Sequence, residues 1–238
     1  ISHRVWKLWK PRNVESTWKG LLNRCPKLRS LRESIGSTNA EQLELVGRLD
    51  KDSDGLLLLT TDAALRSKLL STISPQSSSS PVYKGSAYTK TYRVRTNFPI
   101  DDDQLKALQN GVPITTTSRR RGGTKRTQNT LPCDVERDLK SSTGGKVLLI
   151  TLREGRNRQI RKMIGFLGHR VAALRRLAFG DVDLSGLEGV GDVKYLTEDE
   201  MQRLFECNRG GEENNGDNNN GMEKQFPWRQ RLCDEKGK

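Results

Sequence analysis

Short, continuous apolar runs mark the buried strands of this chain. The runs at residues 56–59 and 146–153 lack polar alternation and are bounded by polar turns, as in strands covered on both faces. Three tryptophans within residues 1–20 indicate an N-terminal strand that packs its aromatic side chains on a core. Further strands are predicted at about residues 88–96 and 174–184.

A second pattern, with apolar residues three or four positions apart, predicts the helices. Ile160, Met163, Ile164 and Leu167 form an apolar stripe, and Gly168 follows where a helix commonly ends. Arg158, Arg161 and Lys162 fall on another face of the same helix. Other helices are expected at residues 63–70 after a capping Asp62, from Asp101 to Asn110, and after the Thr197/Glu200 capping box.

Three polar segments interrupt these elements. Residues 71–86 include a Ser-rich stretch and are expected to be a flexible insert. Residues 115–130 carry five basic side chains and no acid, which fits either an RNA-contacting loop or a disordered, solvated charge run. Residues 207–238 are rich in Asn, Gly and Glu at their start and are expected to be a disordered tail.

The charge balance favours a nucleic-acid partner. The formal net charge is +13, and the six basic and six acidic residues of 207–238 cancel, so the excess lies in residues 1–206. Such a basic surface binds phosphate backbones. No apolar stretch approaches the length of a membrane span, so we expect no membrane partner.

The cysteines and histidines do not form a metal-binding pattern. Four scattered cysteines without a Cys-x-x-Cys pair, and two histidines, make a structural zinc site improbable. We therefore expect no metal and reduced thiols in an intracellular compartment, either the cytoplasm or an organelle. The chain starts at Ile1, so it is expected to be a fragment or a processed form.

The most informative segment is residues 47–62, in which three aspartates and a glycine precede four leucines. A carboxylate at this junction is anchored by the core and faces a polar surface. One interpretation is a single catalytic aspartate, Asp50. A second is an EF-hand calcium loop, but its twelfth position is Thr61 rather than Glu, and a strand pattern follows. A third is an acidic turn without chemistry.

Several motifs, in order, resemble the pseudouridine synthases of the RsuA, RluB, RluE and RluF group, and the RluE type most closely. The catalytic motif of that family corresponds to Gly47-Arg48-Leu49-Asp50 and the following acidic turn. The resemblance covers roughly residues 5–201. Its other motifs are a Lys-Pro motif at 7–12, a Lys-x-Tyr strand at 90–94, a basic helix at 154–163 continuing to 171, and a finish at 180–184 and 196–197.

The resemblance implies a function and a set of site residues. It implies conversion of a uridine to pseudouridine in RNA, with large-subunit ribosomal RNA as the expected substrate, and without a cofactor. Asp50, Tyr92 and Arg161 take the catalytic roles: Asp50 acts on the nucleotide, Tyr92 stacks on the base, and Arg161 pairs with Asp50. The residues expected to bind the substrate are Lys10, Arg48, Arg156, Arg158, Ile160 and Lys162.

The resemblance also implies an α+β fold with a mixed, largely antiparallel sheet, flanking helices and a central cleft. We expect one catalytic domain at residues 1–206, acting as a monomer, with the cleft between 1–70 plus 171–206 and 86–170. The small N-terminal domain of many relatives is absent or lies before Ile1. The alternative function is a non-catalytic RNA-binding protein on the same scaffold.

Overall fold

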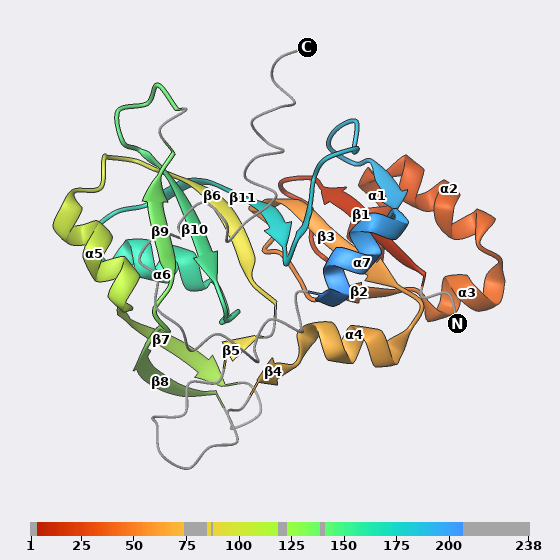
Figure 1. Cartoon of the computed structure of the whole chain (residues 1–238), viewed down its shortest axis with the longest axis horizontal. Coiled ribbons are helices and arrows are strands. Elements are labelled where there is room, and N and C mark those ends of the chain that lie inside the picture. The colour runs from red at the N-terminus through yellow and green to blue at the C-terminus, as the bar shows by residue number, and fades with distance from the viewer. Residues whose placement is uncertain (1–3, 74–84, 87, 119–122, 139–140, 207–238) are drawn as a thin grey trace. The chain divides into compact units, whose positions relative to one another are not determined.

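The computed structural model describes residues 4–73, 85–86, 88–118, 123–138 and 141–206. The described residues form two compact units, one from residues 4–70 and 177–206 and the other from those within 71–176 (Figure 1). The expected division of the chain is close to this one. Residues 74–84 and 119–122 of the two expected inserts and the whole expected tail, 207–238, lie outside the described residues.

The first unit is built on antiparallel strands. β1 (Val5–Lys10) pairs with β3 (Asp54–Thr60) over its whole length and with β13 (Val193–Tyr195) on its other side. β2 (Glu44–Val46) also pairs with β3, and β12 (Val182–Asp183) pairs with the end of β11 (Val171–Phe179). All seven residues of β3 are buried, which confirms the strand predicted from the leucine run.

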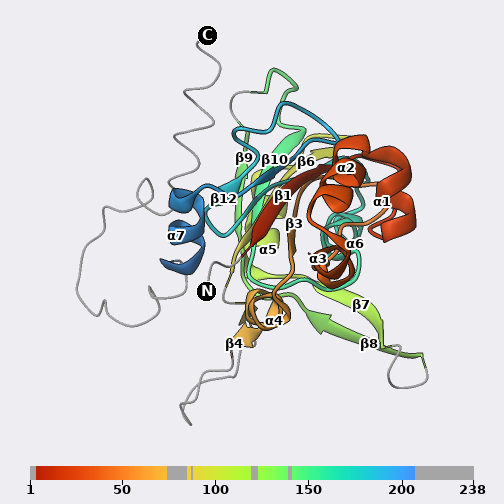
Figure 2. The same cartoon turned by 90° about the vertical axis from the view of Figure 1, so that its right-hand side faces the viewer.

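Helices cover both faces of β1 in this unit. Trp6 and Leu8 pack in one core with residues of α1 (Trp18–Arg24) and α2 (Pro26–Ser34). The ribbons of α1, α2 and α3 (Ser37–Gln42) lie together on this side of β1 (Figure 2). Because side chains alternate along a strand, Lys7 points to the opposite face. There it pairs with Glu200 of α7 (Glu198–Glu206). α4 (Ala63–Leu70) is the helix predicted after Asp62, whose Oδ1 accepts from Leu65 N at 2.9 Å.

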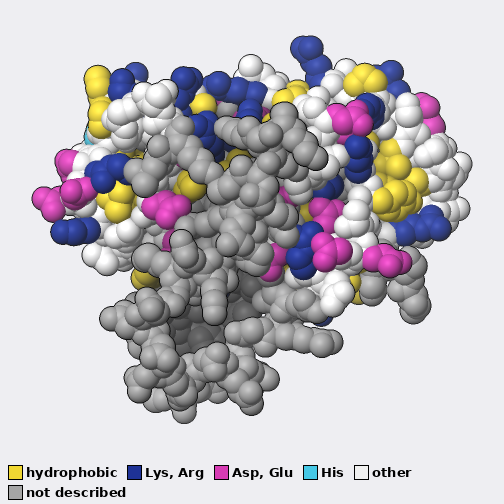
Figure 3. Space-filling model, turned by 45° about the horizontal axis from the view of Figure 1, so that its top comes forward, with side chains coloured by type: hydrophobic (Ala, Val, Ile, Leu, Met, Phe, Trp, Pro, Cys, Tyr) yellow, Lys and Arg dark blue, Asp and Glu magenta, His cyan; other side chains and the backbone are white. Residues whose placement is uncertain are grey.

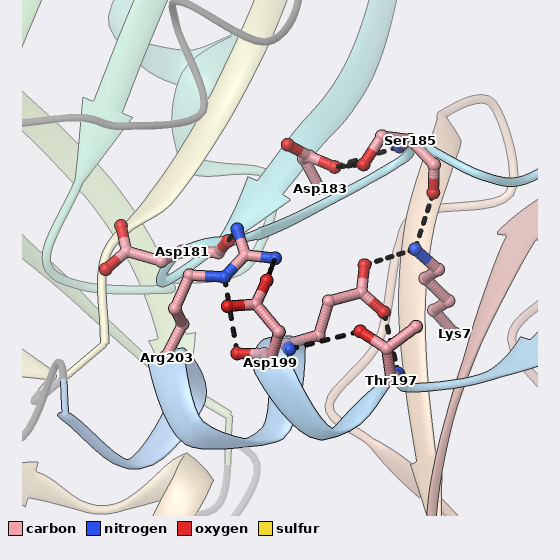
Figure 4. A network of polar contacts seen from close by, with 8 residues as sticks. Lys7, Asp181, Asp183, Ser185, Thr197, Asp199 and Arg203 are labelled. Carbon is pink, nitrogen blue, oxygen red and sulfur yellow. Dashed lines mark hydrogen bonds and ion pairs between the residues drawn. The ribbon is translucent and has the colours of Figure 1, made fainter.

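The contact between β1 and α7 is a buried polar network (Figure 4). The Lys7 ammonium donates to the Glu200 carboxylate and to the Ser185 carbonyl oxygen. Glu200 also accepts from the Thr197 amide at 3.1 Å, while Thr197 Oγ1 accepts from the Glu200 amide at 3.2 Å. This reciprocal pair is the predicted capping box, and it is joined to the core by an ion pair that the sequence did not indicate.

The second unit has the strand order β6 (Lys90–Thr96), β10 (Val147–Leu152), β9 (Asp134–Arg137), with β11 beside β6. β6 with β10 and β10 with β9 are antiparallel. α5 (Asp102–Asn110) begins at the predicted Asp101, which forms a complete capping box with Gln104. α6 (Gln159–Phe166) is the predicted basic helix, and its Ile160, Met163 and Ile164 are buried in the core of this unit.

Two small antiparallel ribbons complete the description. β4 (Thr72–Ile73) pairs with β5 (Gly85–Ser86), and β7 (Pro113–Ser118) pairs with β8 (Thr124–Asn129). The prediction of a loop at 115–130 is therefore wrong for most of that segment, which is a β-hairpin. Its threonines supply the reason, because β-branched residues favour strands.

The expected fold class, α+β with a largely antiparallel sheet and flanking helices, is confirmed. The central cleft stays a prediction. Within the described part of the chain, none of the helices has both the length and the apolar character needed to cross a membrane.

Candidate active site

Asp50 lies in the turn between β2 and β3, on a loop that is fixed on both sides. The neighbouring Leu49 is buried, its amide donates to Ser16 Oγ at 3.0 Å, and its carbonyl accepts from the same hydroxyl at 2.8 Å. The Ser53 amide donates to the Asp50 carbonyl at 3.1 Å, which closes the turn. The Asp50 side chain itself is half-buried, so its carboxylate stays accessible on a held backbone.

Lys10 supports the same loop from inside the protein. Its side chain is fully buried, and Nζ donates to the carbonyl oxygens of Pro11 at 2.9 Å, Ser53 at 2.8 Å and Asp50 at 3.3 Å. These three acceptors match the three N–H donors of an ammonium group. Burial lowers the pKa of Lys10 from 10.5 to about 8, and nearby carboxylates, Asp54 foremost, counteract this. The expected role of Lys10 in binding RNA is corrected, because a side chain without exposed surface cannot contact a ligand directly.

Arg48 places an exposed cation two residues before Asp50. The preceding Gly47 has a φ of +77°, in the left-handed region, and a Cβ there would lie 3.3 Å from the Leu70 side chain. Glycine is therefore favoured for both backbone and steric reasons.

The calcium-loop interpretation does not fit this geometry. Asp54 is buried at the first position of β3, and strands rather than helices flank the turn. Among the described residues, no group of three or more His, Cys, Asp or Glu side chains is arranged to hold a metal ion.

Tyr92 belongs to the second unit and lies on β6, opposite Ile150 of β10. Its side chain is half-buried and packs against the core of that unit. Thr91 and Thr151 bond to each other at 3.0 Å in the buried layer beside it. Tyr92 is thus a partly exposed ring on a strand whose register is fixed by its neighbours.

The basic helix α6 separates its apolar and charged residues as predicted. Ile160 is 4% exposed, whereas Arg161 and Lys162 are half-buried and Arg158 is exposed. Arg161 Nη1 lies 3.5 Å from the Val171 carbonyl oxygen. Arg158 caps the helix with a φ of +51°, a backbone conformation that costs a residue with a Cβ about 1 kcal/mol.

Arg156 does not point freely outward. Its Nε donates to Glu154 Oε2 at 2.8 Å, and its two terminal nitrogens donate to the carbonyl oxygens of Gln128 at 3.2 Å and Asn129 at 2.9 Å. Arg156 was expected to bind the substrate, whereas its guanidinium is engaged with the end of β8.

The structure thus brings the predicted residues together in two groups. Lys10, Arg48 and Asp50 share one loop of the first unit. Tyr92 and the residues of the basic motif belong to the second unit. The proximity of Asp50 to Tyr92 and Arg161 stays a prediction.

The sequence of this chain matches the family model described as RNA pseudouridylate synthase over residues 5–165. The chain belongs to this family. The matched segment contains Lys10, Arg48, Asp50, Tyr92 and most of the basic motif. It supports the RsuA, RluB and RluF group, while the closer likeness to the RluE type stays a prediction.

Individual members of the family agree with this assignment. The dual-specificity RNA pseudouridine synthase RluF of Salmonella typhi is 33% identical over 165 residues, which cover 69% of this chain and 47% of that protein. The ribosomal large subunit pseudouridine synthase B of Bacillus subtilis is 30% identical over 197 residues, covering 83% and 69%. This chain spans about half the length of its RluF relatives.

A crystal structure of a pseudouridylate synthase has the same fold. Its TM-score to this chain is 0.62 at 24% identity, and the match covers 85% of this chain and 74% of the other.

Three residues that shape these groups were not indicated by the sequence. Ser16 holds the Asp50 loop, and Glu154 and Gln159 hold Arg156. Glu154 carried a signal, since it is the only acid among residues 153–176, which include eight Lys or Arg residues. A lone acid in a cationic segment is a candidate structural partner for one of its cations. Ser16 had no comparable signal.

Proposed function

We propose that this protein isomerises a specific uridine to pseudouridine in RNA, and that its substrate is large-subunit ribosomal RNA, as for RluE-type enzymes. The observation that supports this proposal is that Asp50 presents an accessible carboxylate on a loop whose backbone is fixed by Lys10 and Ser16. A catalytic group held in this way needs little reorganisation at the moment of reaction.

The reaction requires few groups. The bond between uracil N1 and ribose C1′ breaks, the base turns, and C5 bonds to C1′ while its proton leaves. Asp50, as a carboxylate, attacks the nucleotide or stabilises the sugar cation when the first bond opens. Arg161 is proposed as its partner, because an adjacent guanidinium favours the ionised form. All atoms of the nucleotide are retained, so the step consumes no second substrate.

Tyr92 is proposed to hold the detached base, and Ile160 to support the wall behind it. Stacking on an aromatic ring restrains a base in one plane while allowing it to rotate, which suits a base that must present C5 in place of N1. The half-buried ring of Tyr92 keeps a surface available for this contact. Ile160 is buried in the core of the same unit, so it provides a rigid apolar wall rather than a mobile contact.

RNA binding is proposed to rest on exposed cations. Arg48 is exposed beside Asp50, and Arg158 is exposed at the start of α6, with Lys162 half-buried behind it. Lys and Arg side chains are visible on the surface in Figure 3, with acidic side chains among them. Extruding a base from stacked RNA costs a few kcal/mol, which phosphate contacts can offset.

The decisive test compares Asp50→Asn with Asp52→Asn, a matched change of charge in the same loop. RNA carrying tritium at uracil C5 releases it to water when C5 bonds to C1′, so release measures the reaction directly. We expect release by the wild type and by Asp52→Asn on ribosomal RNA fragments but not on transfer RNA. Asp50→Asn should bind the same RNA and release nothing.

Two outcomes would contradict the proposal. Tritium release by Asp50→Asn at the wild-type rate would remove Asp50 from the chemistry. Binding without release by the wild type, on every ribosomal and transfer RNA tested, would favour the non-catalytic RNA-binding function.

A further inference from the structure

The guanidinium of Arg156 closes the root of the β7–β8 hairpin. Its terminal nitrogens bond two successive carbonyl oxygens, those of Gln128 and Asn129, at the end of β8. Successive carbonyls on one strand usually point to opposite sides, so a single side chain that bonds both fixes the local course of the strand. Arg156 therefore acts on the backbone of the hairpin.

Arg156 is itself held by two neighbours. Glu154 is 9% exposed, and its Oε2 accepts from Arg156 Nε at 2.8 Å, while its Oε1 accepts from Gln159 Nε2 and from the Leu131 amide at 2.9 Å. Gln159 Oε1 in turn accepts from the Arg156 amide at 2.9 Å. We call Glu154, Arg156 and Gln159 the hairpin clasp. Through it, the start of α6 is bonded to both sides of Thr130, which follows β8.

The hairpin depends on its root because the rest of it has little support. Every residue of β8 is exposed, and a two-stranded ribbon is marginally stable alone. At the root, the Thr130 amide donates to the Val112 carbonyl at 2.9 Å, and Ile114 is buried in the core. The exposed cations Lys125 and Arg126 lie farther along β8. The direction in which they point is thus set where the hairpin leaves the core.

We propose that the hairpin clasp is a positioning device that aims the β7–β8 hairpin as an RNA-contacting arm and ties it to α6. This inference rests on the proposed function only in taking RNA as the ligand. Arg156 then contributes to RNA binding through the hairpin, as a positioning residue. Its charge is matched by the carboxylate of Glu154.

The hairpin clasp and simple electrostatics predict opposite changes in RNA affinity when Glu154 is replaced. Glu154→Gln removes a negative charge from a cationic region, so simple electrostatics predicts tighter RNA binding. In the clasp, both Glu154 oxygens accept hydrogen bonds, so the NH2 group of Gln must face either Arg156 Nε–H or the donors of Gln159 and Leu131. In either orientation a donor meets a donor, and the hairpin root loses part of its support. We therefore expect Glu154→Gln to weaken RNA binding roughly fivefold. Arg156→Lys keeps the charge but loses the planar guanidinium that bonds two carbonyl oxygens, so it should weaken RNA binding to a similar extent.

A double-mutant cycle tests whether Arg156 acts through the hairpin. The full chain is compared as wild type, Arg156→Lys, Lys125→Ala/Arg126→Ala, and the combination, with ribosomal RNA fragments as the probe. If the clasp aims these two cations, removing them should abolish the effect of Arg156→Lys, so the combined loss should equal that of the cation pair alone. The matched control is Arg153→Ala, an exposed arginine at the same end of β10, whose loss should be additive.

Hydrogen exchange provides a readout that needs no RNA. Amides of β8 and the Leu131 amide should exchange roughly ten times faster in Glu154→Gln and Arg156→Lys than in the wild type or Arg153→Ala. Thermal melting checks that each variant is folded. If the proposed reaction failed for another reason, these exchange and binding results would still stand. Additive losses in the cycle, unchanged exchange in both clasp variants, or tighter binding by Glu154→Gln would each overturn the inference.

Discussion

Replacing Lys10 with Met should loosen the Asp50 loop, and the structure allows the size of the effect to be worked out. Methionine keeps the apolar stem but removes the donor for three carbonyl oxygens. A hydrogen bond from a charged donor contributes about 1.5–3 kcal/mol, so the three together contribute on the order of 4–9 kcal/mol. Against this, the lowered pKa of about 8 corresponds to a cost of about 3 kcal/mol for keeping the ammonium buried.

The net loss for Lys10→Met is therefore about 1–6 kcal/mol, which for a chain of this size lowers Tm by several degrees. Urea unfolding and thermal melting measure it, and Lys51→Met, in the same loop but exposed, is the control. Tritium release should fall further than stability explains, because Asp50 loses one of its backbone supports. Unchanged stability together with wild-type tritium release in Lys10→Met would refute the reasoning.

Three further predictions concern Lys10 and two other sites of the first unit. Between pH 8 and 10.5 the unfolded chain holds the Lys10 proton that the folded protein has released, so Lys10 should raise the free energy of unfolding by up to about 3 kcal/mol as the pH rises. Urea titrations should show a rise smaller by about that amount in Lys10→Met, because Lys90, whose pKa burial also lowers to about 8, still contributes. Asn13 has a φ of +63°, so Asn13→Val should lower the free energy of unfolding by about 1–2 kcal/mol and Asn13→Gly by less than about 0.5 kcal/mol. The corresponding decreases in Tm measure both effects. Glu200→Gln breaks the buried pair with Lys7 and should cost about 3–5 kcal/mol with faster amide exchange in α7, while Lys7→Met/Glu200→Leu should recover most of it.

The elements predicted correctly are those whose signals are local. The leucine run gives β3, the stripe from Ile160 gives α6, and the acid at position 101 gives the start of α5. Asn13 has a φ of +63°, a conformation that Asn adopts more readily than most residues with a Cβ. In each case neighbouring residues decide the conformation, so distant parts of the chain were not needed.

The missed elements are short and polar. α1 to α3 were not predicted, although Thr17 accepts from the Gly20 amide as an N-cap and Pro26 occupies the first turn of α2. α1 and α2 each present only a few apolar residues to the core, and α3 has no buried residue. Their stability comes from packing against β1 and β3, which a local pattern cannot show.

The same contrast between local signals and distant packing applies to the candidate site. The motifs named candidate residues, but the charge of a residue did not reveal whether its side chain is exposed. Residues 153–176 include eight Lys or Arg residues, yet Arg176 is 2% exposed and Arg156 is bonded to the hairpin, whereas Arg153, Arg158 and Arg170 are exposed. A buried or internally bonded cation shapes the protein, and only an exposed one can release counterions from RNA. The basic motif therefore has two functions, holding the hairpin and contacting the ligand, and burial separates the residues that serve each.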